Sequence, residues 1–78
     1  MRITQTKQFK KDLIKQIQRG KRPEKLFEFL DMLIAGQELA DRYRDHPLRG
    51  NWVGRRDCHL EPDWVLIYQK MENEIVLE

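Results

Sequence analysis

Apolar residues recur at helical spacing near the start of the chain. Phe9, Leu13 and Ile17 follow one another at every fourth position, which predicts a helix with one buried stripe and a lysine-rich face toward water. Thr6 is placed to cap this helix, because its hydroxyl can accept a hydrogen bond from a free first-turn N–H. Gly20 is placed to end it, since glycine tolerates the backbone conformation common after a helix.

A second amphipathic segment follows after a short link. Pro23 suits the first turn of a helix, where its missing N–H costs nothing. Leu26, Leu30 and Leu33 then give a broader apolar face than the first helix has, and Gly36 is the predicted stop. Because the link is short, we expect the two helices to form an antiparallel hairpin.

The second half of the chain changes to strand signals. Residues 64–70 are apolar on both faces, which is typical of a central strand, and residues 61–63 and 72–73 have the composition of turns. Residues 37–47 show no clear period, so we expect a loop with a helical turn near residues 39–43. The predicted strands are residues 1–5, 48–52, 55–60, 64–70 and 74–77, with a hairpin turn at residues 53–54.

The resulting order, β-α-α-β-β-β-β, predicts a single α+β domain over residues 1–78, with the helical hairpin on one face of a mostly antiparallel sheet. Hydrophobic residues are 40% and charged residues 36% of the chain, which is typical of a folded soluble domain. No apolar run approaches the length that crosses a membrane, and no secretion signal opens the chain. We therefore expect no membrane partner and a cytoplasmic protein, and Cys58, the only cysteine, excludes an internal disulfide.

Charge is unevenly distributed along the chain. Residues 1–25 hold nine Lys or Arg against two acidic residues, whereas the remainder is acidic. A basic face of this kind attracts polyanions such as nucleic acid, although a solvated helix face explains the pattern equally well. The candidate RNA-binding residues are Lys10, Lys11, Lys15, Arg55 and Arg56.

Both histidines of the protein lie within residues 45–68. Two imidazoles meet the needs of phosphodiester transfer in RNA: one takes the proton of the attacking 2′-hydroxyl, and the other protonates the departing 5′-oxygen. His46 and His59 are the candidates for these roles. Taken singly, each histidine is more often a partly buried polar residue than a catalyst.

Three further residues of this segment add to the interpretation. Asp63 could orient a histidine or act as a base, although it is also an ordinary turn residue after proline. Trp52 and Trp64 offer faces for an unstacked base, although a tryptophan that opens an apolar strand usually belongs to the core. An arginine from the 55–56 pair would stabilise the negative transition state.

Metal binding is the main chemical alternative, and the spacing of the ligands speaks against it. Adjacent strand residues point to opposite faces, so Cys58 and His59 cannot both reach one ion. No Cys-x-x-Cys or His-x-x-x-His pair is present. We expect no metal and no cofactor. The possible ligands considered were His46, Cys58, His59, Glu61 and Asp63.

The same segment closely resembles the signature of a known toxin family, the YafQ branch of the RelE/ParE superfamily. The residues that carry the resemblance are Asp45-His46-Pro47-Leu48 and Gly50-x-Trp52-x-Gly54-x-Arg56-Asp57-x-His59-x-Glu61-Pro62-Asp63-Trp64-x-Leu66-Ile67-Tyr68.

The resemblance implies a RelE-like fold and the toxin of a type II toxin–antitoxin system, a metal-independent endoribonuclease that cuts messenger RNA on the ribosome. By position, His46, His59, Asp63 and Trp64 match residues of that family's active site. The implied partners are a cognate RelB- or DinJ-like antitoxin, the ribosome and mRNA, and operator DNA only through the antitoxin. A basic first helix would then face ribosomal RNA.

One departure from the family pattern changes the expectation. YafQ-like chains continue after the last strand with an Arg-Thr-Gly-(Ser or Thr)-His segment and a terminal Leu-Phe, and that histidine is often given an acid or base role. This sequence stops at Glu78. We therefore expect weakened cutting, and the alternative is a catalytically impaired toxin-fold module that binds its antitoxin and acts in promoter repression. A ParE-like gyrase poison is the weakest alternative, because such toxins lack this histidine-rich motif.

Overall fold

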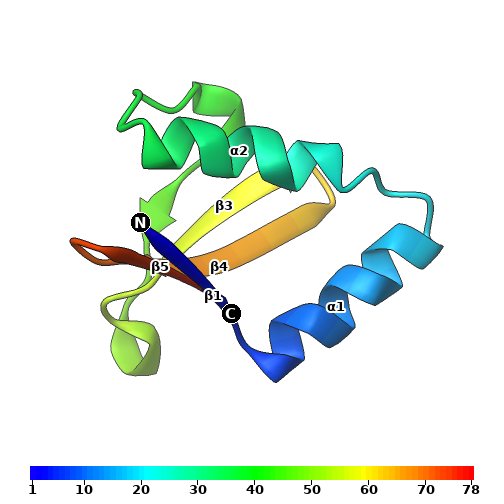
Figure 1. Ribbon diagram of the computed structural model, residues 1–78, viewed down its shortest axis with the longest axis horizontal. Coiled ribbons are helices and arrows are strands. Elements are labelled where there is room, and N and C mark those ends of the chain that lie inside the picture. Colours follow the sequence, from blue (N-terminus) through cyan, green and yellow to red (C-terminus); the bar gives the residue numbers. More distant parts are fainter.

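The structure is a computed structural model that describes all 78 residues (Figure 1). It has the predicted order β-α-α-β-β-β-β, with two short 3₁₀ helices in the loops, and the predicted α+β class is confirmed. No helix is long and apolar enough to cross a membrane. The elements are β1 (Arg2–Gln5), α1 (Lys7–Gln18), α2 (Glu24–Ile34), η1 (Asp41–Tyr43), β2 (His46–Pro47), η2 (Gly50–Trp52), β3 (Arg56–Glu61), β4 (Trp64–Lys70) and β5 (Glu74–Leu77).

The strands form one mixed sheet in the order β1-β5-β4-β3-β2. Only β1 and β5 run parallel, and every other neighbouring pair is antiparallel, as predicted. β4 lies in the middle of the sheet, which confirms it as the central strand. Its burial nevertheless alternates: Trp64, Leu66 and Tyr68 are buried, whereas Val65 is exposed. The two faces of the sheet therefore have different surroundings.

The two helices contribute unequally to the core. Thr6 caps α1 as predicted, with its Oγ1 accepting a hydrogen bond from the Phe9 backbone N–H at 3.1 Å. Phe9 is the only buried residue of α1, whereas four residues of α2 are buried. Figure 1 shows α2 lying across β3 and β4, with α1 diverging from it as an open hairpin. Much of the surface of α1 is consequently free.

A single core lies between the helices and one face of the sheet. Phe29 packs against the rings of Tyr43 and Tyr68, with centroids 5.3 and 5.7 Å away. The 13 buried residues of the core are Phe9, Leu26, Phe29, Leu30, Leu33, Tyr43, Cys58, Leu60, Trp64, Leu66, Tyr68, Ile75 and Leu77.

The loop before β3 differs from the prediction. The strand expected over residues 48–52 is absent: pairing with β3 is confined to His46–Pro47, and residues 50–52 form η2 instead. Gly50 and Gly54 adopt positive φ angles of 64° and 90°, which an extended strand does not allow. The helical turn expected near residues 39–43 is confirmed as η1.

Candidate active site

The face of the sheet opposite the core brings the two histidines together around one carboxylate. His46 on β2 stands directly opposite Asp57 on β3, and His59 follows two residues later on the same face. The Nε2 atoms of His46 and His59 lie 4.0 and 3.9 Å from the same Asp57 Oδ1. We call this surface the open face; it carries His46, Asp57, His59, Val65 and Ile67.

Asp57 is the site residue that sequence reasoning missed. Its Oδ1 atom is buried and has no hydrogen-bond partner, and such an orphaned carboxylate oxygen is costly unless a positive charge is near. The only cationic partners within 4.0 Å of it are the two imidazoles. The carboxylate is thus placed to stabilise a proton on either ring. Its spacing of two residues from His59 was the available sequence signal.

Backbone carbonyls orient both histidine rings. His46 Nδ1 lies 2.7 Å from the carbonyl oxygen of Arg44, and His59 Nδ1 lies 3.4 Å from that of Pro62. Because a carbonyl oxygen only accepts, each Nδ1 is the donor in these contacts, and each Nε2 faces Asp57. Arg44 has φ +48°, the only positive φ outside glycine, so its carbonyl is held in an uncommon orientation.

A second carboxylate anchors the segment that carries His46. Asp45 accepts a hydrogen bond from Arg56 Nε at 2.5 Å and another from the Tyr68 hydroxyl. Burial and the Asp45 carboxylate raise the pKa of Tyr68 well above its ordinary value, so the phenol stays a donor. The hydrogen bond to Asp45 also raises the pKa of Arg56. Arg56, a predicted RNA-binding residue, thus has its Nε committed to the fold.

Asp63 and Trp64 are engaged in contacts of their own, Asp63 in an ion pair and Trp64 in the core. Asp63 pairs with Lys21 Nζ at 2.5 Å, and this hydrogen bond lowers the pKa of the carboxyl group. Lys21 also bonds Glu61 at 3.0 Å, so the turn between β3 and β4 is fastened to the link between the helices. Trp64 is 5% exposed. The prediction that Trp64 offers an open face to a base is therefore wrong, because its ring belongs to the core.

Two arginines from the loop before β2 lie beside His59. Arg42 and Arg44 line a cavity of about 300 Å³ together with His59 and Pro62. Neither arginine was singled out in the sequence, because both lie in a loop without periodicity. Their charge beside His59 gives the open face the electropositive character that a phosphate requires.

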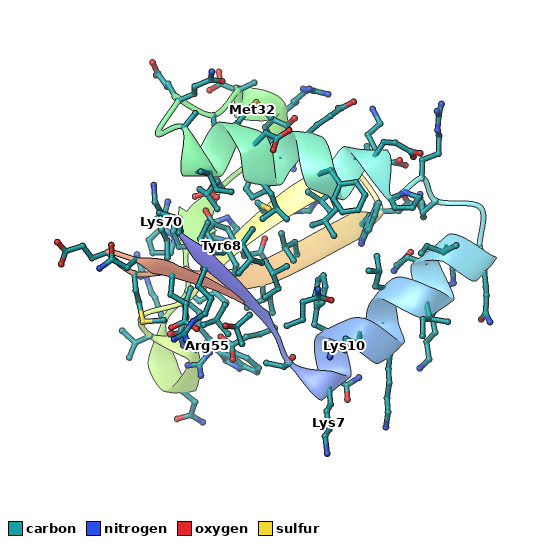
Figure 2. All side chains as sticks on the ribbon, in the orientation of Figure 1. Lys7, Lys10, Met32, Arg55, Tyr68 and Lys70 are labelled. Carbon is teal, nitrogen blue, oxygen red and sulfur yellow. The ribbon has the colours of Figure 1, made fainter.

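The predicted lysines of α1 border a different part of the surface. Lys15 and Arg19 line a groove between α1 and β4 whose floor includes Trp64 and Val65. Val65 is directly opposite His59 in the sheet register, whereas His59 itself does not line this groove. Lys10 and Lys11 are exposed on the same helix, and Figure 2 shows Lys10 there.

Cys58, which was considered as a possible metal ligand in the alternative that the spacing disfavours, points away from the histidines. Its side chain is fully buried in the core, so the prediction that Cys58 and His59 face opposite sides of β3 is confirmed. No group of three or more His, Cys, Asp or Glu side chains is arranged to hold a metal ion.

Comparison with known proteins identifies the family. A family model described as the bacterial toxin of type II toxin–antitoxin system, YafQ, matches residues 1–78. This chain belongs to the YafQ toxin family. It is 44% identical over 63 residues to the mRNA interferase toxin YafQ of Escherichia coli K12, which covers 80% of this chain and 68% of that toxin. The family resemblance inferred from the motif is thereby confirmed, and the chain is the toxin of a toxin–antitoxin system.

Solved structures of YafQ relatives share the whole fold. YafQ in the E. coli DinJ–YafQ complex superposes with a TM-score of 0.86 at 39% identity, covering 100% of this chain and 89% of the other. A copper-bound mutant toxin from Helicobacter pylori gives a TM-score of 0.93 at 31% identity, with the same coverage. The copper and the DinJ partner belong to those proteins.

Proposed function

We propose that this YafQ-family toxin is a ribosome-dependent endoribonuclease in which His46 and His59 exchange protons with the message. The observation that carries the proposal is the placement of both Nε2 atoms within 4.0 Å of one Asp57 oxygen. The E. coli relative is named an mRNA interferase, which favours a nuclease over the non-catalytic, antitoxin-binding alternative.

In the proposed reaction, one imidazole takes the proton from a 2′-hydroxyl as that oxygen attacks the neighbouring phosphorus. The bond from phosphorus to the 5′-oxygen breaks, and the other imidazole donates its proton to the leaving oxygen. The products are a 2′,3′-cyclic phosphate and a free 5′-hydroxyl. One positive charge disappears from the second ring as another appears on the first, and Asp57 stabilises it at either position. No metal takes part in this scheme.

The remaining site residues take supporting parts in the proposal. Arg42 and Arg44 beside His59 supply positive charge for the phosphate oxygens as negative charge develops. Asp63, through its ion pair with Lys21, fixes the turn that presents the Pro62 carbonyl to His59. Trp64 supports the site from the core. We therefore assign Asp63 and Trp64 positioning roles in place of direct contact with RNA.

The proposed partners follow from the relatives and from charge. YafQ of E. coli forms a complex with DinJ, and we propose that this chain pairs with a RelB- or DinJ-like antitoxin and reaches operator DNA only through it. Lys10, Lys11 and Lys15 lie on the exposed side of α1, where they would contact ribosomal RNA. Binding of the toxin to the ribosome should accordingly weaken with salt.

The test is cleavage of a translated message by the purified chain, with the new 5′ ends mapped. Wild type is expected to cut only when ribosomes translate the message. His46→Gln and His59→Gln should each lose about 10²- to 10⁴-fold in rate. Glu28→Gln, an exposed change on α2, serves as the matched control. No cutting by wild type on translating ribosomes, or full cutting by both histidine variants, would overturn the proposal.

A further inference from the structure

Trp52 is an exposed aromatic ring that the proposed chemistry does not use. It lies in η2 and is 50% exposed, whereas Trp64, the other tryptophan, is buried. The backbone of this loop depends on Gly50 and Gly54, which both have positive φ. The turn that these two glycines allow therefore leaves the large Trp52 ring exposed to solvent.

The ring is held in place by an ordered pair of charged residues. The Arg55 guanidinium carbon lies 5.5 Å from the Trp52 ring centroid, a cation–π contact. Arg55 Nε in turn donates to Glu78 Oε2 at 2.7 Å, and both of these side chains are half-buried. Figure 2 shows Arg55 beside η2. Because Arg55 already restrains the ring, the protein loses little additional conformational entropy when a ligand stacks on it.

This platform lies beside the histidine cluster on the same surface. The Leu48 N–H donates to the Arg55 carbonyl at 2.9 Å, so backbone pairing with the loop extends to the residue just before β3. Residues 55, 57 and 59 alternate with core-side residues, which places Arg55 next to Asp57 on the open face, about 7 Å along the strand. A single strand that passes His46 and His59 would therefore reach Trp52 with a neighbouring nucleotide.

We propose that Trp52, backed by Arg55 and Glu78, is a stacking subsite for one unpaired nucleobase next to the phosphate that is cut. The ligand class is a nucleobase of single-stranded nucleic acid; the assumption that the strand is messenger RNA rests on the proposed function. Stacking on an indole uses the π-face that every base has, so the subsite tolerates any base. Its contribution is to fix the register of the strand against the two imidazoles.

The two tryptophans allow a direct test in this chain. Wild type and Trp52→Phe are titrated with a short single-stranded 2′-deoxy oligonucleotide, which lacks the hydroxyl needed for cutting, and with an abasic strand of equal length. The oligonucleotide is expected to quench wild-type fluorescence but to leave Trp52→Phe, which reports only buried Trp64, unchanged. The abasic strand should cause no quenching in either protein. Equal quenching by both strands would overturn the subsite.

Affinity supplies the second measurement. Trp52→Ala should bind the oligonucleotide about 5- to 100-fold more weakly, as expected for one lost stacked base. Phe27→Ala, which removes an exposed aromatic ring from α2 on the core side of the sheet, is the control and should bind like wild type. Glu78→Gln, which frees Arg55, should show a smaller loss. Unchanged oligonucleotide binding by Trp52→Ala overturns the proposal. It is also overturned if Trp52 fluorescence responds to a protein partner but not to the oligonucleotide.

The outcomes also separate this subsite from the nuclease proposal. If binding depends on Trp52 but wild type cuts no translated message, the subsite stands and the nuclease proposal falls. If wild type cuts a translated message but Trp52→Ala binds the oligonucleotide as well as wild type, the nuclease proposal stands and the subsite proposal falls. Thermal unfolding of Trp52→Ala, expected to match that of wild type because the ring is exposed, guards against a folding defect.

Discussion

The two faces of β3 and β4 differ sharply although the same two strands build both. On the core face Cys58, Leu60 and Leu66 are buried beneath α2. On the open face Asp57 and His59 alternate with them, one residue away, beside cationic loops. Because successive side chains of a strand point to opposite faces, residues of the candidate site and residues of the core are neighbours in the sequence.

The comparison shows what each face tolerates. The core face has no buried charged residue, and its one thiol is fully enclosed. On the open face, the Oδ1 atom of Asp57 is buried without a hydrogen-bond partner, an arrangement that lowers the stability of the fold. Substitutions on the core face should therefore affect folding, and substitutions on the open face should affect activity.

The largest expected effect on stability comes from Leu66→Ala on the core face. Leu66 is 3% exposed, and removing it should cost about 2–5 kcal/mol of unfolding free energy. Val65→Ala, one residue away and 47% exposed, is the matched control and should change stability by less than about 0.5 kcal/mol. Urea unfolding followed by circular dichroism measures both. Equal losses would contradict the assignment of the two faces.

Asp57→Asn should produce the opposite pattern, with lost activity and an intact fold. The amide keeps the shape but cannot stabilise a protonated ring, so cleavage should fall about 10- to 100-fold. Stability should be equal or higher, since the charge is removed and the amide N–H₂ can donate where the carboxylate oxygen has no partner. Asp31→Asn, an exposed change on α2, is the control, and wild-type cleavage by Asp57→Asn would refute the role.

The buried thiol makes a smaller, pH-dependent contribution. Burial raises the pKa of Cys58 well above its ordinary value, so above about pH 8.5 the unfolded chain loses a proton that the folded chain keeps. Stability should then fall with rising pH, by about 1.4 kcal/mol per pH unit from this group. Cys58→Ala should show a shallower slope between pH 8.5 and 9.5 in urea titrations. Identical slopes would exclude the contribution.

Local patterns sufficed for the elements that depend on local chemistry. The cap at Thr6, the stripe of α2 and the central strand β4 were all predicted, because periodicity and capping act over a few residues. The predicted strand over residues 48–52 was wrong because two glycines adopt positive φ and turn the chain into η2.

The missing parts of the site depend on residues that are distant in sequence. The importance of Asp57 comes from its register with His46, which only the folded sheet reveals. Arg42 and Arg44 reach His59 through a loop that carries no period. The two-residue period of a strand was enough to place Trp64 in the core, since Trp64 shares a strand face with Leu66 and Tyr68.

The smallest expected effect concerns Asp63, at the turn where the chain passes from β3 to β4. Lys21 lowers the pKa of the Asp63 carboxyl group, so this ion pair stabilises the fold above the pKa of an unfolded aspartate, about 3.9, and the benefit is lost as pH falls further. Asp63→Asn should therefore match wild type closely at neutral pH and lose less stability between pH 5 and 3. Thermal unfolding across that range, with exposed Asp31→Asn as control, measures the difference. If Asp63→Asn instead abolished cleavage at neutral pH with unchanged stability, Asp63 would belong with the two imidazoles as a catalytic residue in place of a positioning one.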